Sequence, residues 1–447
     1  MNLFRFVSLS KFDKILNWLM AMSIFLDAYI IARGSLPFDF YHYYLIYFVF
    51  IINYMAKKKP VKLFERWFLI SILMLFVASI IASLQQNILG FGFVKQVIGI
   101  TFSSAAYYAF IRFNDFNLQK VFDLYLRVAF WVASIGIFEE FAKIAGLGAL
   151  FKHAKTVKLG FHRVWSIMGE PYFLAVVLIP ALFYYGAKMF GNRGYNDRSV
   201  LVKFGVILTG TLFTFSSAGF MAIGFMAIVI AWEKGLFSFK KGRILLLPFV
   251  LIAVFSAYQY VQKNMYEFRT KINQTIEAFN NTKITPFILD QMNSTTFALY
   301  SNFKIAQESY NKNKLLGGGL GSHAKNYDKL FTSQFDAKYL ERFGELNKYD
   351  ANSLFIRLLS ETGLLGLAMF FFFMLKFRLK RKHLEVPELA NFVLINHGIF
   401  ILFIVRLVRT GNYIGNGFFF FFFLYYFTAA QVKKYYKKQK LELAQGQ

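Results

Sequence analysis

The feature that most constrains this chain is a succession of apolar segments, each about as long as a membrane span, interrupted by one long polar stretch over residues 261–353. A bilayer core requires about 20 apolar residues per helix, and fewer where aromatic or basic residues anchor the ends. The expected spans are residues 15–32, 41–55, 67–83, 93–111, 121–138, 172–187, 204–215, 220–232, 244–261, 354–375, 389–405 and 414–430. The sequence therefore predicts an all-α polytopic membrane protein with about 12 transmembrane helices.

Composition supports this class and removes others. Hydrophobic residues make up 57% of the chain and charged residues only 17%. The formal net charge of +27 would suit a nucleic-acid-binding protein, but the lysines and arginines stand in short runs between apolar segments, where they act as topology signals. No nucleic acid is therefore expected as a partner. The absence of cysteine excludes disulfides, thiolate catalysis and cysteine-ligated metals.

The basic runs alternate along the chain as the positive-inside rule requires, which places both termini in the cytoplasm and the long polar stretch outside. The connections expected on the cytoplasmic side are residues 57–62, 112–120, 188–203, 234–243, 376–382 and the tail. Residues 204–215 and 220–232 are short and fit either two spans or one re-entrant hairpin. Both alternatives keep the same sidedness for everything that follows.

Four regions result from this topology. They are residues 1–260 with about nine spans and an outer connection at 139–171, residues 261–353 as a large periplasmic lid loop, residues 354–432 with the last three spans, and residues 433–447 as a basic cytoplasmic tail.

The lid loop is expected to be small and not independently folded, because its apolar content is modest. Helical periodicity predicts surface helices over residues 264–279 and 295–310, and glycine predicts a loop over 317–321. The phenylalanine runs at 370–373 and 418–423 are interpreted as compositional bias on lipid-facing helices.

Several cations break the alternation because they fall on the outer face. For the lysines of the outer connection, snorkelling toward lipid headgroups and solvation are the favoured interpretation. These lysines are Lys143, Lys152, Lys155 and Lys158. For Arg163, Arg357, Arg406 and Arg409 a diphosphate at the outer surface is favoured, because the planar guanidinium matches phosphate oxygens and an unpaired cation at membrane depth costs about 3 kcal/mol or more.

Acidic residues also gather near the outer face, where one of them could deprotonate a sugar hydroxyl. Asp350, at the junction of lid and membrane, is the preferred base, and Glu170 and Glu361 are the other candidates. Glu361 follows Arg357 by four residues, so pairing with that arginine is favoured slightly over catalysis. His323 follows the glycine loop and is kept as a candidate ligand-binding residue, although a solvated histidine is the commoner outcome. The histidines show no metal-ligand spacing, and neither a metal nor a cofactor is expected.

Four motifs resemble, in order and in sidedness, those of the O-antigen polymerase and ligase superfamily across roughly residues 90–430. An arginine precedes Gly-acid-Pro at the start of a span, a Thr/Ser break follows, and a glycine-rich loop precedes a signature behind the large outer loop. The motifs are residues 163–175 (RVWSIMGEPYFLA), 214–219 (TFSSAG), 316–321 (LGGGLG) and 352–354 (NSL) with 359–366 (LSETGLLG).

Two departures bear on the branch of the family. Where members often have His before the Asn of the signature, this chain has Ala351, and where they often have Arg after the paired serines, it has Ala218. The histidine is associated with ligases, in which it is proposed as the base. Its absence favours a polymerase and leaves Asp350 as the substitute.

The resemblance implies a bacterial inner-membrane polysaccharide polymerase of Wzy type, which transfers a growing glycan from undecaprenyl diphosphate onto a lipid-linked repeat unit. The implied partners are the undecaprenyl-diphosphate-linked donor and acceptor and membrane lipids, with a chain-length regulator as a further candidate. An O-antigen ligase and a lipid-linked oligosaccharide flippase or transporter remain the alternatives. One long loop with charges concentrated on one face favours chemistry over transport.

Overall fold

The computed structural model describes residues 10–32, 40–58, 61–147, 157–158, 160–190, 197–234, 252, 255–256, 259–260, 262–264, 266–280 and 286–445. The bundle consists of α1 (Lys11–Met22), η1 (Ser23–Phe25), α2 (His42–Lys57), α3 (Arg66–Gln85), α4 (Phe91–Phe113), α5 (Leu118–Ile144), α6 (Pro171–Met189), α7 (Arg198–Phe213), α8 (Ser217–Glu233), α15 (Leu354–Lys376), η5 (Arg381–Glu385), α16 (Pro387–Val408) and α17 (Phe418–Gln445). The lid consists of α10 (Tyr266–Asn280), α11 (Pro286–Gln291), α12 (Ser294–Lys312), α13 (Ser322–Gln334) and α14 (Lys338–Phe343). Two short antiparallel hairpins pair β1 (Ile30–Ala32) with β2 (Phe40–Tyr41) and β3 (Val157–Lys158) with β4 (Phe161–His162).

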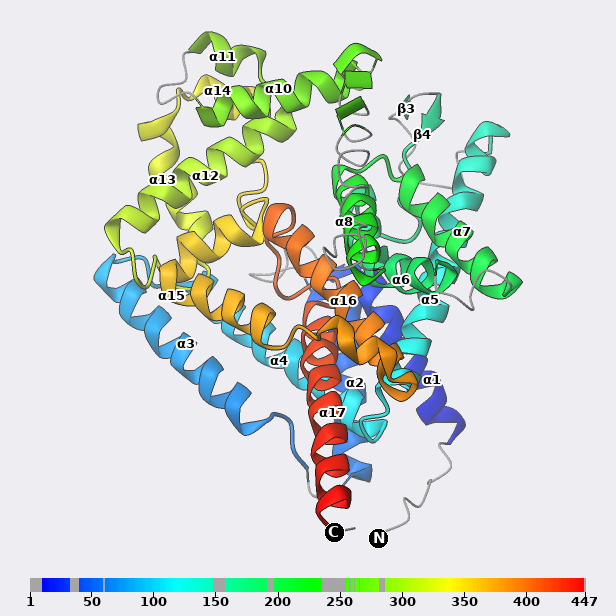
Figure 1. Ribbon diagram of the computed structural model, residues 1–447. Helices are drawn as coiled ribbons and strands as arrows, with labels where there is room; N and C mark the ends of the chain where they lie inside the picture. The colour runs from blue at the N-terminus through cyan, green and yellow to red at the C-terminus, as the bar shows by residue number, and fades with distance from the viewer. Residues whose placement is uncertain are drawn as a thin grey trace.

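The lid lies at one end of the bundle, and α17 ends at the opposite end (Figure 1). We call these ends the lid side and the tail side. Among the described helices, α3, α5, α6, α15 and α16 are each long and apolar enough to cross a membrane. The protein is thus an all-α polytopic membrane protein, as predicted.

Most of the expected spans in the described part of the chain correspond to helices within a few residues. The first does not, because its helix ends at Phe25 and the β-branched Ile30 and Ile31 enter the β1–β2 hairpin instead. The span expected at 244–261 lies largely outside the described residues. Helices α7 and α8 are separate and meet on the lid side, and their rises of about 24 and 26 Å are shorter than a bilayer core of about 30 Å.

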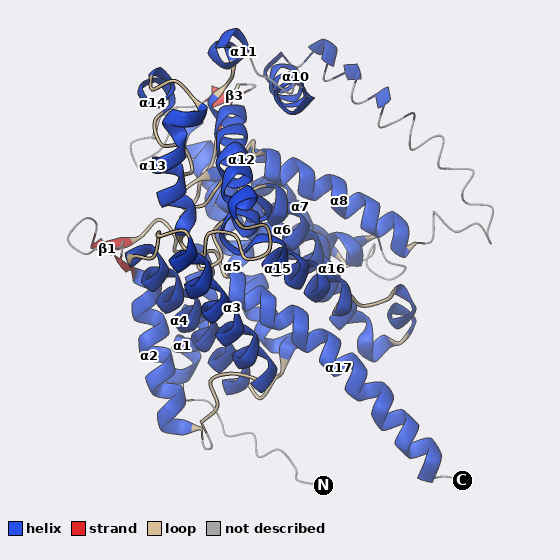
Figure 2. Cartoon of the chain, turned by 90° about the vertical axis from the view of Figure 1, so that its left-hand side faces the viewer, coloured by secondary structure: helices blue, strands red, loops and turns tan. Residues whose placement is uncertain are grey.

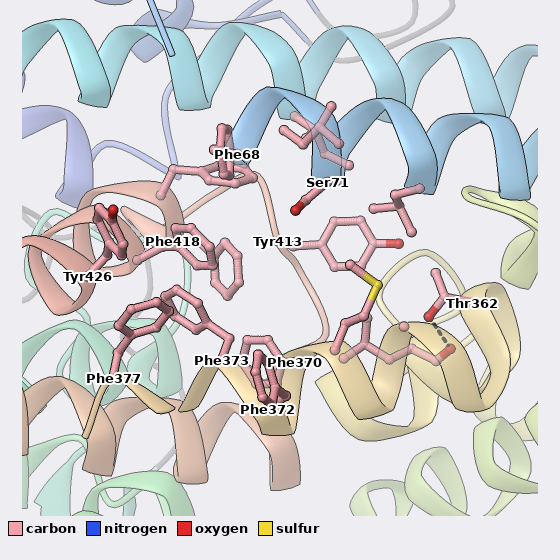
Figure 3. A pocket seen from close by; sticks show the side chains of 18 of the residues that line it. Phe68, Ser71, Thr362, Phe370, Phe372, Phe373, Phe377, Tyr413, Phe418 and Tyr426 are labelled. Carbon is pink, nitrogen blue, oxygen red and sulfur yellow. Dashed lines mark hydrogen bonds between the residues drawn. The ribbon is translucent and has the colours of Figure 1, made fainter. Parts of the chain in front are cut away.

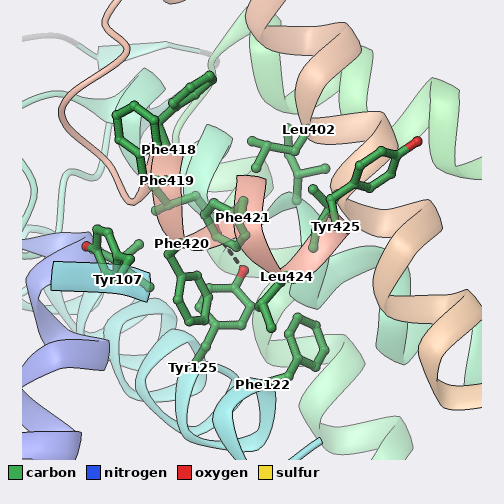
Figure 4. Close-up of a cluster of buried hydrophobic side chains, with 14 of the residues drawn as sticks. Tyr107, Phe122, Tyr125, Leu402, Phe418, Phe419, Phe420, Phe421, Leu424 and Tyr425 are labelled. Carbon is green, nitrogen blue, oxygen red and sulfur yellow. Dashed lines mark hydrogen bonds between the residues drawn. The ribbon is translucent and has the colours of Figure 1, made fainter. Parts of the chain in front are cut away.

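Aromatic side chains form the centre of the bundle (Figure 4). Phe420 and Phe421 of α17 are fully buried against Tyr125 of α5, whose hydroxyl donates to the carbonyl of Val177 at 2.6 Å. The interpretation of residues 418–423 as lipid-facing is therefore wrong for most of the run. A one-dimensional run of phenylalanine does not reveal which helices surround it.

The lid has a hydrophobic core of its own, which the sequence underestimates. Phe297 of α12 is fully buried, and its ring lies 4.3 Å from that of Phe343 and 5.7 Å from that of Phe335. The predicted surface helices correspond to α10 and α12, and three further helices complete the cap seen in Figure 2. The lid is a packed helical unit and not only a loop.

Helix α15 is broken at Gly363, where φ is +58°. The glycine loop of the lid enters this break: Gly318 N donates to Ser360 O and Gly319 N to Glu361 O, both at 2.8 Å. In return, Leu364 N donates to the carbonyl of Lys314 at 2.9 Å. The loop thus supplies the backbone hydrogen bonds that the broken helix lacks, as a membrane-embedded backbone requires.

Close approach explains the glycines. A Cβ on Gly317 would lie 2.7 Å from both Gly363 N and Ser360 O, and Gly317 itself has φ +64°. The expected loop at 317–321 is confirmed. Gly317 lies against the backbone of α15, whereas Gly319 lies against Ser79 of α3 and Gly321 against Gly92 of α4. The expected continuous span at 354–375 is corrected to two helical halves.

Candidate functional site

A pocket of about 610 Å³ lies where the lid meets the lid-side ends of the bundle helices. Its bundle wall includes Arg163, Glu170, Tyr172, Phe215, Ser216, Ser217, Met221, Val408 and Arg409. Its lid wall includes Ile272, Thr275, Ile276, Ser294, Thr295, Thr296, Ala298, Leu299, Leu346, Asn347 and Asn352. We call it the lid pocket. It brings together the segment 163–172, the α7–α8 turn, the end of α16 and the lid.

A buried carboxylate of α5 fixes the segment that carries Arg163 and Glu170. One oxygen of Glu139 accepts from the backbone N–H groups of Trp165 and Ser166, at 3.0 and 2.7 Å. A carboxylate that accepts backbone N–H groups makes strong, charge-assisted hydrogen bonds. The loop that forms one wall of the lid pocket is therefore held by the bundle itself.

Lys143 balances the charge of Glu139. Its ammonium forms an ion pair with the other Glu139 oxygen, and both side chains are buried. The snorkelling interpretation is therefore wrong for Lys143, because a carboxylate on the same helix face, at i and i+4, offers a closer partner than lipid headgroups. Lys152, Lys155 and the side chain of Lys158 lie outside what the structure describes.

The two arginines of the pocket wall differ in their contacts. Arg163 donates from Nε to the carbonyl of Thr214, at 3.2 Å, which ties the segment 163–172 to the α7–α8 turn. Arg409 follows the last residue of α16, and its guanidinium has no hydrogen-bond or ion-pair partner among the described residues. A cation of this kind is available to an anionic ligand.

Glu170 faces the same pocket, immediately before the first residue of α6. No described side chain or backbone group hydrogen-bonds its carboxylate. Partial burial raises the pKa of Glu170, and the negative charge of Asp350 raises it further, while Arg163 and Arg409 oppose the shift. A carboxylate with a raised pKa is suited to take a proton.

Asp350 lies beside the pocket in a strained turn. Its Oδ1 accepts from Asn352 N and from Asn347 Nδ2, both at 3.1 Å. Asn347, Ala351 and Asn352 all have positive φ, a conformation that costs free energy and is frequent at functional sites. Burial raises the pKa of Asp350. Because one oxygen is used to hold the turn, Asp350 is less free to act on a substrate than Glu170 is.

Arg357 and Glu361 form a buried ion pair on α15, as the favoured interpretation predicts. Arg357 Nε lies 3.2 Å from Glu361 Oε1, and its Nη1 donates to the carbonyl of Gly411 at 3.0 Å. The hydroxyl of Tyr413 donates to the other Glu361 oxygen, and the Tyr413 ring lies 4.0 Å from the guanidinium. Neither residue lines the lid pocket.

Arg406 is fully buried and holds the connection between α16 and α17. Its two terminal nitrogens donate to the carbonyls of Asn412 and Asn416, at 2.9 and 2.8 Å. Although Arg406 and Arg409 are three residues apart, only Arg409 reaches the lid pocket.

His323 is buried in the core between the lid and α15. Its ring nitrogens lie 2.9 Å from Ser360 Oγ and from Asn302 Oδ1. Burial lowers its pKa to about 3, so the ring is neutral at physiological pH. The structure therefore places His323 away from the lid pocket, as a residue that joins two elements and is not solvated.

A family model described as O-Antigen ligase matches residues 203–371. The chain carries an O-antigen ligase family domain. This domain places the protein in the O-antigen polymerase/ligase superfamily of glycosyl-transferring membrane enzymes. No curated protein matches the chain.

The O-antigen ligase family domain contains the α7–α8 turn, the lid and most of the broken helix α15. Arg163 and Glu170 precede it in sequence, and Arg409 follows it. The lid pocket therefore combines the family domain with segments on both of its sides.

Asp27, which the sequence does not single out as a candidate base, lies next to the segment that carries Glu170. Its Oδ1 accepts from Gly169 N at 3.2 Å, and its Oδ2 is buried without a hydrogen-bond partner. Burial raises the pKa of Asp27 to about 7. Its expected position near the outer face is a weak signal, and only the fold brings it next to Glu170.

Among the described residues, no group of three histidine or acidic side chains could hold a metal ion.

Proposed function

We propose that this protein is a polysaccharide polymerase of the bacterial inner membrane, which joins undecaprenyl-diphosphate-linked repeat units on the periplasmic side. The observation that carries the proposal is the lid pocket, in which the guanidinium of Arg409 and the carboxylate of Glu170 face the same space, neither with a hydrogen-bond partner among the residues described. Glycosyl transfer from a lipid diphosphate requires both: a cation for the leaving group and a base for the acceptor.

The donor diphosphate binds Arg409 and Arg163 in this proposal. Charge grows on the diphosphate as the bond from the anomeric carbon to its oxygen breaks, and the two guanidinium groups stabilise that charge. Arg357 and Arg406 act indirectly, because they do not line the lid pocket and they donate to Glu361 and to backbone carbonyls. They hold the connection between α16 and α17, which begins at Arg409.

Glu170 is the proposed base. The acceptor hydroxyl attacks the anomeric carbon of the donor sugar, its proton passes to Glu170, and undecaprenyl diphosphate leaves. Asp350 supports this step, since its charge contributes to the raised pKa of Glu170. That Asp350 is itself the base remains a prediction. The pH dependence of the Asp350→Asn variant distinguishes it from the proposal that Glu170 is the base.

A polymerase is favoured over a ligase by the surroundings of Ala351. This residue is fully buried against Ala306 and Ile356, and no described histidine lines the lid pocket. A histidine base of the kind proposed for ligases therefore has no counterpart among the described residues. The candidate base, Glu170, faces a pocket that the lid covers at one end of the bundle. This also argues against a flippase, since transporter sites typically lie near the bilayer midplane.

The glycans of a strain that lacks this gene test the function. Complementation with the unaltered protein should restore long polymer, while Glu170→Gln should leave single lipid-linked repeat units. Glu341→Gln, on the exposed face of α14, is the matched control and should behave as the unaltered protein. Long polymer retained on the lipid carrier would instead indicate a ligase, and loss of outward-facing repeat units a flippase.

Reporter fusions test the membrane orientation separately. Fusions at Lys58 and Lys438 should report the cytoplasm, and a fusion at Asn293 in the lid should report the periplasm. A cytoplasmic signal at Asn293 would refute the proposed site of polymerisation.

A further inference from the structure

A second cavity, of about 720 Å³, lies between α3, α15 and α17. Phenylalanine side chains of α15 and α17 contribute to its wall, among them Phe370, Phe373 and Phe418 (Figure 3). We call it the aromatic groove. It does not share a lining residue with the lid pocket, and Tyr413 closes its lid-side end.

Helix α3 covers this groove but packs closely only near its two ends. At the tail-side end, the ring of Trp67 lies 4.6 Å from that of Tyr426. At the lid-side end, Ser83 Oγ donates to Gly318 O at 3.1 Å and Gln86 Nε2 to Gly317 O at 2.9 Å. Only about a fifth of α3 is buried in the protein (22%), and an apolar space remains beneath it. A lipid chain fits such a space, since water would find few polar partners there.

The two ends of the aromatic groove differ in charge. Lys376 and Lys433 line its tail-side end, and neither has an acidic partner among the described residues. At the lid-side end, the hydroxyls of Thr362 and Tyr413 are already bonded, to Leu358 O and to Glu361. An anionic headgroup therefore finds cations at the tail side, whereas the described residues that line the lid-side end offer it no free donor of comparable strength.

We propose that the aromatic groove binds an anionic phospholipid of the tail-side leaflet, with an acyl chain along Phe370 and Phe373 and the phosphate between Lys376 and Lys433. Trp67 and Tyr426 lie at the headgroup end, where aromatic residues commonly mark the membrane interface. The undecaprenyl carrier is the competing occupant, but its diphosphate would lie at the lid side. The proposal does not depend on the polymerase activity.

Tryptophan fluorescence tests the site directly, because Trp67 lines the groove. We would prepare two single-tryptophan variants, one that keeps Trp67 and one that keeps Trp131, which is 61% exposed on α5. Each is reconstituted in phosphatidylcholine vesicles that contain brominated phosphatidylglycerol or brominated phosphatidylcholine. Brominated phosphatidylglycerol should half-quench Trp67 at a mole fraction about 5- to 25-fold lower than brominated phosphatidylcholine requires, because each lysine should favour the anionic lipid by a factor of about five. Trp131 should be quenched equally by both lipids.

Lysine substitutions provide the matched control. Lys376→Gln with Lys433→Gln should remove the preference at Trp67, whereas Lys437→Gln with Lys438→Gln, in the same exposed tail, should keep it. Equal quenching of Trp67 by both lipids, or a preference that survives loss of Lys376 and Lys433, would overturn the proposal. The proposal would also be overturned if undecaprenyl diphosphate protects Trp67 from quenching by brominated phosphatidylcholine while unbrominated phosphatidylglycerol does not.

A second measurement uses the chain with all its tryptophans. Native mass spectrometry should detect phosphatidylglycerol that remains bound to the unaltered protein after exchange into detergent. The same lipid should be lost from the variant with Lys376→Gln and Lys433→Gln. Equal retention by both proteins would contradict the assigned headgroup position.

Discussion

The wall of the lid pocket and the cluster behind it contain the same kind of residue in opposite circumstances. In the wall, Arg409 has no hydrogen-bond or ion-pair partner and Glu170 accepts no hydrogen bond, within the part of the chain that the structure describes. In the cluster, Arg357 and Glu361 are bonded to each other, and Arg406 donates to two backbone carbonyls. In sequence all of these are charges near one face of the membrane. A charged side chain that faces the pocket with its hydrogen-bonding groups unused is available to a ligand, whereas one that donates to neighbouring groups in the core holds the fold.

The largest expected effect is on stability, in the buried cluster. Arg357→Met leaves Glu361 as an unpaired buried charge, which should lower the free energy of unfolding by about 3 to 5 kcal/mol. Thermal unfolding in detergent measures the change. The double variant Arg357→Met/Glu361→Leu should recover much of the loss because no charge remains buried. A single variant as stable as the unaltered protein would show that the pair does not hold the fold.

A smaller effect concerns pH and the buried His323. Its pKa of about 3 in the folded state lies below the ordinary value of 6.5, so the unfolded state binds more protons between these values. The contribution of His323 to stability should therefore fall as the pH drops below about 6.5, by up to about 1.4 kcal/mol per pH unit. Asp27, whose pKa is raised, contributes a slope of opposite sign, so the comparison of variants isolates the part due to His323. His323→Gln should remove this part of the slope between pH 6.5 and 5, whereas His42→Gln, at a largely exposed position, should not.

The smallest effect is a shift in the pH dependence of the polymerisation rate, caused by a substitution beside the wall of the lid pocket. Asp350→Asn removes a negative charge that raises the pKa of Glu170, so that pKa should fall. The acidic limb of the polymerisation rate should then move to lower pH, because Glu170 remains deprotonated there. If instead the rate falls by about 10² or more at every pH with the limb unmoved, Asp350 is the base.

Much of the fold follows from local pattern. Apolar segments between basic runs predict helices such as α2, α5 and α6, because a bilayer sets their length and no partner is needed to identify them. The Arg357–Glu361 pair was also predictable, since residues four apart share a helix face.

What the sequence does not reveal depends on contacts between distant segments. The break in α15 at Gly363 exists because the loop at 314–319, about fifty residues earlier, satisfies its backbone groups. His323 is neutral because it meets Asn302 and Ser360, which neither composition nor spacing places beside it. For the same reason the sequence could identify the four arginines as candidates, but it could not show that two of them line the lid pocket and the other two are buried in the bundle.

Binding of undecaprenyl diphosphate to Arg409→Lys and Arg406→Lys tests that division most directly, because the two residues are three apart on one chain segment. Arg409→Lys should weaken binding by about tenfold or more and leave the unfolding temperature unchanged, since lysine keeps the charge but loses the fork. Arg406→Lys should lower the unfolding temperature, since one ammonium cannot replace both carbonyl bonds in the same geometry. Measured where both variants are folded, unaltered binding by Arg409→Lys would contradict the account.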